Sequence, residues 1–103
     1  MIKVCNKYGT APITANLVWY GSVAPTGYEQ YIRAFLVKGP DGKSVGFAGS
    51  VQYDTAGPYT INPGQCIDIG AYVAIDPAIP SNLANGNTVL GQYQINVVMS
   101  PTA

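Results

Sequence analysis

The chain has 103 residues, enough for one domain with a modest core, and only 10% of them are charged. Five basic residues balance five acidic ones, so the formal net charge is zero. This balance argues against nucleic-acid binding and against electrostatic docking on anionic membranes, both of which need a basic surface. A surface with so little charge also lacks the repulsion that keeps copies of a protein apart, so we expect self-association.

The sequence shows no segment that would place the protein in or across a membrane. No apolar run approaches the roughly 18 residues of a membrane span. The opening residues MIKVCNKYGT enter a strand-like pattern without a hydrophobic leader, so the protein is made without one or a leader has been removed. An extracellular or surface-assembled location is the favoured expectation.

The first two segments alternate apolar and polar residues, the pattern of a strand with one buried face. In residues 2–8, Ile2 and Val4 are expected to face inward, opposite to Lys3, Cys5 and Lys7. Residues 12–21 repeat the pattern. Their inward residues are Ile13, Ala15, Leu17 and Trp19, and their outward residues are Thr14, Asn16, Val18 and Tyr20.

Residues 27–38 are the ambiguous part of the chain. Thr26 and Glu29 have the spacing of a helix capping box, and Glu29 and Arg33 that of a helical ion pair. The segment is rich in Tyr, Ile, Phe and Val, however, and the turn Pro40-Asp41-Gly42 follows it directly. We therefore favour a strand that enters a hairpin, with a short helix as the alternative. Residues 44–54 are a further strand candidate, weakened by glycines.

Two more alternating segments lie in the second half of the chain, separated by a proline-containing loop over residues 76–87. In residues 66–76, Ile67, Ile69, Ala71, Val73 and Ile75 are expected to face inward, and Asp68, Gly70, Tyr72 and Asp76 outward. In residues 87–99, the inward residues are Val89, Tyr93, Ile95, Val97 and Met99, and the outward row is Thr88, Gln92, Gln94 and Asn96. That uncharged last strand is either central and paired on both sides, or an edge open to another chain.

Short strands separated by turns predict an all-β fold, an antiparallel β-sandwich of about seven strands that is Ig-like or jelly-roll-like. Residues 1–103 are expected to form a single domain. The predicted core consists of Ile13, Leu17, Trp19, Ile67, Ile69, Val73, Ile75, Tyr93, Ile95 and Val97.

The residue types present leave little room for catalysis. The chain has no histidine, which removes Ser-His-Asp and Cys-His mechanisms and most zinc sites. Asp68 and Asp76 share one strand face but lie more than about 20 Å apart at roughly 3.3 Å per residue, too far for a glycosidase pair. We expect no catalytic residues, no metal and no cofactor. Cys5 and Cys66 are either a disulfide or two buried thiols.

The outward aromatic and amide side chains are the candidates for a ligand- or partner-binding surface, because tyrosine combines apolar area with a hydrogen-bonding tip. They are Asn16, Tyr20, Asp68, Gly70, Tyr72, Gln92, Gln94 and Asn96. The alternative is that these residues only decorate the sheet. We expect a non-enzymatic structural or self-assembling protein, such as a coat, fibre or surface subunit. A carbohydrate-binding module is the first alternative, and a secreted inhibitor or toxin is the second.

Overall fold

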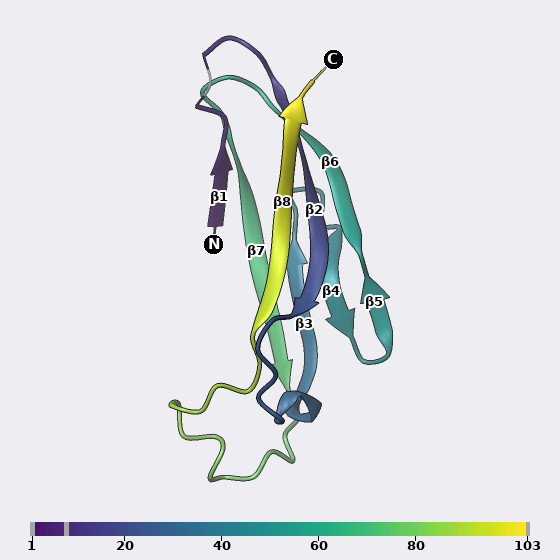
Figure 1. Ribbon diagram of the computed structural model, residues 1–103, viewed down its shortest axis with the longest axis vertical. Coiled ribbons are helices and arrows are strands. Elements are labelled where there is room, and N and C mark those ends of the chain that lie inside the picture. The colour runs from purple at the N-terminus through teal and green to yellow at the C-terminus, as the bar shows by residue number, and fades with distance from the viewer. Residues whose placement is uncertain (1, 8, 103) are drawn as a thin grey trace.

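The computed structural model describes residues 2–7 and 9–102, which form an elongated β-sandwich of 52 × 25 × 22 Å (Figure 1). The strands are β1 (Ile2–Cys5), β2 (Ile13–Ser22), β3 (Ile32–Lys38), β4 (Ser44–Ala48), β5 (Val51–Tyr53), β6 (Thr55–Ile61), β7 (Cys66–Ile75) and β8 (Tyr93–Pro101). A single 3₁₀ turn, η1 (Glu29–Tyr31), precedes β3. Residues 76–92 form a long loop at one end of the sandwich (Figure 1).

The strands form two antiparallel sheets, one with the order β1-β7-β3-β4-β5 and one with the order β6-β2-β8. The predicted all-β antiparallel sandwich is therefore confirmed, with eight strands over the described residues rather than about seven. Two of these strands were not expected as separate strands: β5, which was included in the segment 44–54, and β6, where the dipeptide Gly57-Pro58 is typical of a turn. The structure keeps both residues in a strand, and the pairing of β6 with β2 shifts register there, between Ala15 and Leu17.

The core lies between the sheets and is small. Its buried members are Leu17, Val45, Ala56, Tyr59 and Ile69. The ring of Trp19 packs beside them at 6.1 Å from Phe35 and 5.5 Å from Tyr93, measured between ring centroids. Of the predicted core, Leu17 and Ile69 are buried. Ile13, Trp19, Ile67, Tyr93 and Ile95 are partly buried.

The prediction of burial is wrong for three residues of the predicted core. Val73 is 51% exposed, Ile75 is 41% exposed and Val97 is 36% exposed. Their orientation follows the alternation, because Val73 pairs with Phe35 and Val97 pairs with Leu17 on the inner faces of the sheets. These side chains face inward, but none of the described strands covers them.

The ambiguous segment is a strand, as favoured, and the alternative helix is reduced to the single turn η1. The capping contact nevertheless forms, because the Thr26 backbone N–H donates to Glu29 Oε2 at 2.7 Å. The predicted pair of Glu29 with Arg33 does not form. Arg33 Nη2 lies 3.3 Å from Asp76 Oδ1 instead, since β3 runs beside β7.

Several strand boundaries also differ from the prediction. Residues 44–54 contain two strands, β4 and β5, separated by a turn at Gly49 and Ser50. The last strand begins at Tyr93, so Thr88 and Val89 lie in the preceding loop. There the Asn85 side chain accepts the backbone N–H of Thr88 at 3.0 Å, which stabilises a turn in place of strand pairing. The first strand ends at Cys5, and Tyr8, predicted to lie in it, falls outside the described residues.

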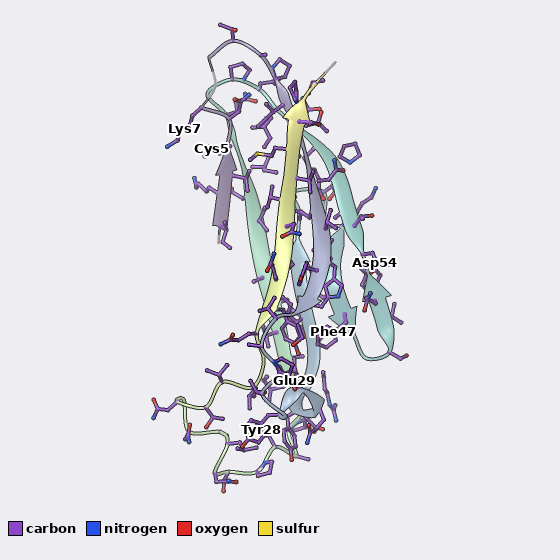
Figure 2. The ribbon with its side chains drawn as sticks, in the orientation of Figure 1. Cys5, Lys7, Tyr28, Glu29, Phe47 and Asp54 are labelled. Carbon is purple, nitrogen blue, oxygen red and sulfur yellow. A yellow bond between two sulfur atoms is a disulfide. The ribbon has the colours of Figure 1, made fainter. Side chains whose placement is uncertain are left out.

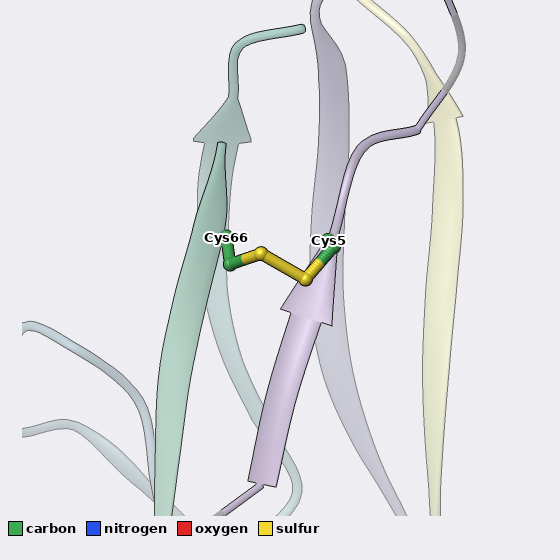
Figure 3. Close-up of a disulfide and its surroundings, with 2 residues drawn as sticks. All are labelled: Cys5 and Cys66. Atoms are coloured by element: carbon green, nitrogen blue, oxygen red, sulfur yellow. A yellow bond between two sulfur atoms is a disulfide. The ribbon is translucent and has the colours of Figure 1, made fainter. Parts of the chain in front are cut away.

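Cys5 and Cys66 form a disulfide, so the free-thiol alternative is wrong (Figure 3). The two residues are directly opposite each other in the β1–β7 pair. They lie on the outer face, since their neighbours Val4 and Ile67 pair on the inner face. The bond ties the short first strand to β7.

Candidate functional site

The last strand, with its outward row of uncharged side chains, was expected to be either central or at an edge. The structure places it, as β8, at the edge of the three-stranded sheet. It pairs with β2 along its whole length, and no other described strand pairs with it. At its two ends, the Gln92 carbonyl accepts from Val23 and the Thr102 N–H donates to Pro12. Because backbone groups alternate sides along a strand, even-numbered residues bond to β2. The backbone groups of Ile95, Val97 and Met99 therefore point to the free edge.

The neighbouring edge of the five-stranded sheet is also incomplete. β1 pairs only with residues 66–69 of β7, and β3 pairs with residues 70–75 on the other side of that strand. Within the part of the chain that the structure describes, residues 70–75 have no partner on the β1 side. Figure 1 shows β1 starting about halfway along β7.

The two sheets are offset, so that the larger one extends past β8. The rings of Trp19 on β2 and Tyr93 on β8 pack on Phe35 of β3 and Phe47 of β4. β8 therefore lies over β3. β7 and β1, which follow β3 in the sheet order, extend beyond the cover that the smaller sheet provides (Figure 1).

An apolar hollow of about 250 Å³ lies where the cover ends. It is lined by Ile2, Val4, Leu17, Phe35, Val37, Ile69, Tyr93, Ile95 and Val97, none of which carries a charge. The inward-facing but exposed side chains Ile2, Val73, Ile75, Val97 and Met99 lie on β1, β7 and β8. We call this surface, the hollow together with those five side chains, the open side.

The residues predicted to form a binding surface do not form one site. Asp68, Gly70 and Tyr72 lie on the outer face of the five-stranded sheet. Asn16, Tyr20, Gln94 and Asn96 belong to β2 and β8 in the other sheet, and Gln92 precedes β8. The alternation of each strand showed which side chains face outward, but it could not show to which sheet the strand belongs.

On the outer face of the five-stranded sheet, Lys38 extends toward Tyr72, with Nζ 6.0 Å from the ring centroid. Gly70 is directly opposite Lys38, and a Cβ placed at Gly70 would meet no atom within 4 Å. Among the described residues, Gly70 therefore leaves open space in this row of outward side chains. Beside this row, a hollow of about 430 Å³ is lined by Leu36, Lys38, Gly42, Lys43, Ser44, Ala48, Tyr53 and Thr55.

The contact between Tyr59 and Asp41 could not be predicted from the sequence, because β6 was not expected. The buried Tyr59 hydroxyl donates to Asp41 Oδ1 at 2.7 Å and so joins β6 to the turn between β3 and β4. Burial, with the hydrogen bond to Asp41, raises the pKa of Tyr59 to about 12. The same bond lowers the pKa of Asp41. Gly39 permits this approach, since a Cβ there would collide with the Tyr59 ring.

Asn6 is a second polar residue that the sequence analysis overlooked. It is fully buried, and its Nδ2 donates to the carbonyls of Ala11 and Ile61, both at 2.9 Å. These bonds tie the loop after β1 to the end of β6. Asn6 stands between Cys5 and Lys7 in the sequence, and no local pattern there indicates this role. Asn6 is a structural residue, because its amide is occupied by backbone partners.

The chemistry available to the described residues is limited. They contain no cluster of three or more Cys, Asp or Glu side chains suited to holding a metal ion. None of their helices has the length and apolar character needed to cross a membrane. No protein-family model matches the chain, and a search of curated proteins finds no match. The open side is therefore the candidate site that the geometry itself distinguishes.

Proposed function

We propose that the protein is a non-enzymatic structural subunit that self-assembles through its open side. The supporting observation is that inward-facing apolar residues of β1, β7 and β8 remain exposed there. Inward-facing apolar side chains that remain exposed along one side of a domain are typical of an interaction site. A neighbouring subunit that covered Val73, Ile75 and Val97 would complete the core that the alternation specifies.

The accessible surface is consistent with a missing partner. The chain exposes 6430 Å². A monomer of 10.8 kDa exposes roughly 5,500 Å², so the excess is about 900 Å². One partner in a standard protein interface buries about 800 Å².

β8 also lacks the devices by which edge strands avoid pairing. Natural edges are blunted by lysine, internal proline, bulges or very short length. β8 has nine residues, none of them charged, and its proline stands at the last position. Its pairing with β2 contains one register shift, and the extra residue lies on β2. Another chain could therefore pair along the free edge of β8.

Sedimentation from micromolar to millimolar concentration tests the proposal. We expect oligomers that Val97→Lys weakens at least ten-fold, because the lysine would place a charge in the apolar hollow. Val98→Lys is the matched control, since Val98 is the next residue on β8, is also exposed and faces the other way. A strict monomer over the whole range would overturn the proposal.

Carbohydrate binding is the second candidate function, and the hollow of about 430 Å³ beside Tyr53 favours it. This volume falls within the roughly 300–1,000 Å³ of small-ligand sites, and its lining includes Ser44, Thr55 and two lysines. A glycan array is the test. We expect any binding to be lost in Tyr53→Ala and kept in Val97→Lys, and an array without binding would overturn this candidate.

A further inference from the structure

The free edge of β8 presents both hydrogen-bonding groups and an apolar floor. The backbone groups of Gln92 and Thr102 bond toward the β2 side, so the even-numbered residues of β8 face β2. The backbone N–H and C=O groups of Ile95, Val97 and Met99 therefore point away from β2. A strand placed beside β8 at about 4.8 Å would lie over β7, because β8 itself lies over β3. Such a strand would pair with this edge and cover Val73 in the same step.

The overhang of the larger sheet restricts what can occupy this position. A second folded copy that paired through its own β8, with its larger sheet on the same side as that of the first copy, would bring its own β3 and β7 beneath that strand. These strands would have to occupy the space that β7 and β1 of the first copy already fill. β1 cannot move aside as an exchanged arm, because the Cys5–Cys66 bond ties it to β7. The position fits a single strand without a second sheet beneath it.

The lining defines the chemistry of that strand. The hollow of about 250 Å³ is smaller than the roughly 300–1,000 Å³ of small-molecule sites, and it suits a few apolar side chains. Neither the hollow nor β8 carries a charge, so a charged side chain facing inward would lose its hydration without gaining a partner. The strand therefore needs apolar side chains at alternate positions on its inner face.

We infer that the open side accepts one extended, uncharged strand from an arm or loop of another polypeptide chain, added beside β8 in the manner of β-augmentation. This inference rests on the proposed function for its choice of surface. It goes further by specifying a single inserted strand in place of edge-to-edge pairing of two sandwiches.

A synthetic peptide with the sequence of residues 92–100, QYQINVVMS, is a suitable probe because it is uncharged and apolar at alternate positions. Calorimetry should show saturable one-to-one binding, accompanied by a rise in the thermal midpoint. A peptide of the same composition, reordered so that apolar residues come in adjacent pairs, should bind at least ten-fold more weakly. Equal binding of the two peptides would overturn the inference.

Two methylated peptides separate strand addition from simple adsorption. One carries N-methyl groups on its odd-numbered amides and the other on its even-numbered amides. Since only one set of amides faces β8, we expect one peptide to lose binding and the other to keep it. Val73→Asp should weaken binding at least ten-fold, whereas Tyr72→Asp, the adjacent and equally exposed residue on the outer face, should not. Equal behaviour of the two methylated peptides, or of the two variants, would contradict strand addition.

The outcomes distinguish this inference from the proposed function. A chain that forms oligomers but binds no peptide would retain self-assembly and overturn the single-strand acceptor. A strict monomer that binds the peptide with the expected methylation pattern would overturn self-assembly and support the acceptor.

Discussion

The two long sides of the sandwich have opposite construction. On one side, the chain passes directly from β5 into β6 at Asp54, so the two sheets are joined covalently (Figure 2). On the other side, β1 and β8 are distant in the sequence, and inward-facing apolar side chains remain exposed between them. A sandwich can therefore cover its inward-facing side chains along one edge and leave them exposed along the other, although its strands follow the same alternation.

The closed side shows how this fold protects an edge when it does so. The edge strand β5 has only three residues. On β6, Pro58 has no backbone N–H and so removes one hydrogen-bond donor from that edge. The Asp54 carbonyl accepts from the Trp19 N–H at 2.8 Å, which fixes the crossover. On the open side β1 is also short, with four residues, but β8 has nine residues and its proline stands at the last position. This difference at β8 supports interpreting the open side as a site and not as an incidental edge.

The largest expected effect concerns the bond that holds β1 at the open side. Cys5 and Cys66 are 61 residues apart in the sequence, so removing the bond restores the freedom of a long loop to the unfolded chain. We expect the double substitution of both cysteines by serine to cost about 4 kcal/mol in the free energy of unfolding. Urea unfolding measures this, with the reduced parent as control. A loss below about 1 kcal/mol would show that strand pairing alone holds β1.

The next prediction compares two positions on the inner face of the same strand. Ile69 is 4% exposed and Val73 is 51% exposed. We expect Ile69→Ala to cost about 3 kcal/mol, as a large-to-small change in a packed core. Val73→Ala should cost less than about 1 kcal/mol, because little apolar area leaves contact. Equal costs in urea unfolding of the isolated chain would remove the distinction between covered and open parts of the core.

The alternation in the sequence predicted the sandwich and the orientation of its strands well. Ile69 and Val73 illustrate the limit, because both were assigned correctly to the inner face of β7 and only one is buried. Burial depends on what lies opposite, which is set by sheet order and by the offset of the sheets. Neither quantity is encoded in the period of a single strand.

The candidate site was less predictable than the fold for the same reason. The uncharged character of β8 was visible in the sequence, and so was its potential for pairing with another chain. Its place at an edge follows from long-range pairing with β2, which no local pattern reports. Tyr72 and Tyr20 were grouped because both face outward, but they belong to different sheets.

A smaller effect is expected on the closed side, where Tyr59 joins β6 to the turn at Asp41. Tyr59→Phe removes a hydrogen bond to a carboxylate and should cost about 1.5 kcal/mol at pH 7. The raised pKa of Tyr59 adds a signature in alkali. Because the folded state favours the neutral phenol, its contribution is complete below pH 10.0 and is lost as the pH rises toward about 12.

The stability difference between parent and Tyr59→Phe should therefore shrink as the pH is raised from 9 to 11. Tyr53→Phe is the control on the same side, since Tyr53 is exposed on β5. Its difference from the parent should stay small at every pH. Parallel curves for the parent and Tyr59→Phe would show that the Tyr59 hydroxyl does not contribute to stability through its protonation.

The smallest effect is expected at the loop end of the open side, where Glu29 holds the segment that leads into β8. Its carboxylate accepts from the Thr26 backbone N–H and hydroxyl, both at 2.7 Å, and the same hydroxyl contacts the Leu90 carbonyl. These bonds, led by the Thr26 N–H, lower the pKa of Glu29 below its ordinary value of 4.5. A depressed folded-state pKa gives stability that is present above pH 4.5 and is lost as the pH falls through the lower value.

We expect Glu29→Gln to be slightly less stable than the parent at pH 7, with the difference disappearing in acid, as measured by urea midpoints. A difference that stays constant down to pH 3 would show that the charge of Glu29 does not stabilise this end of β8.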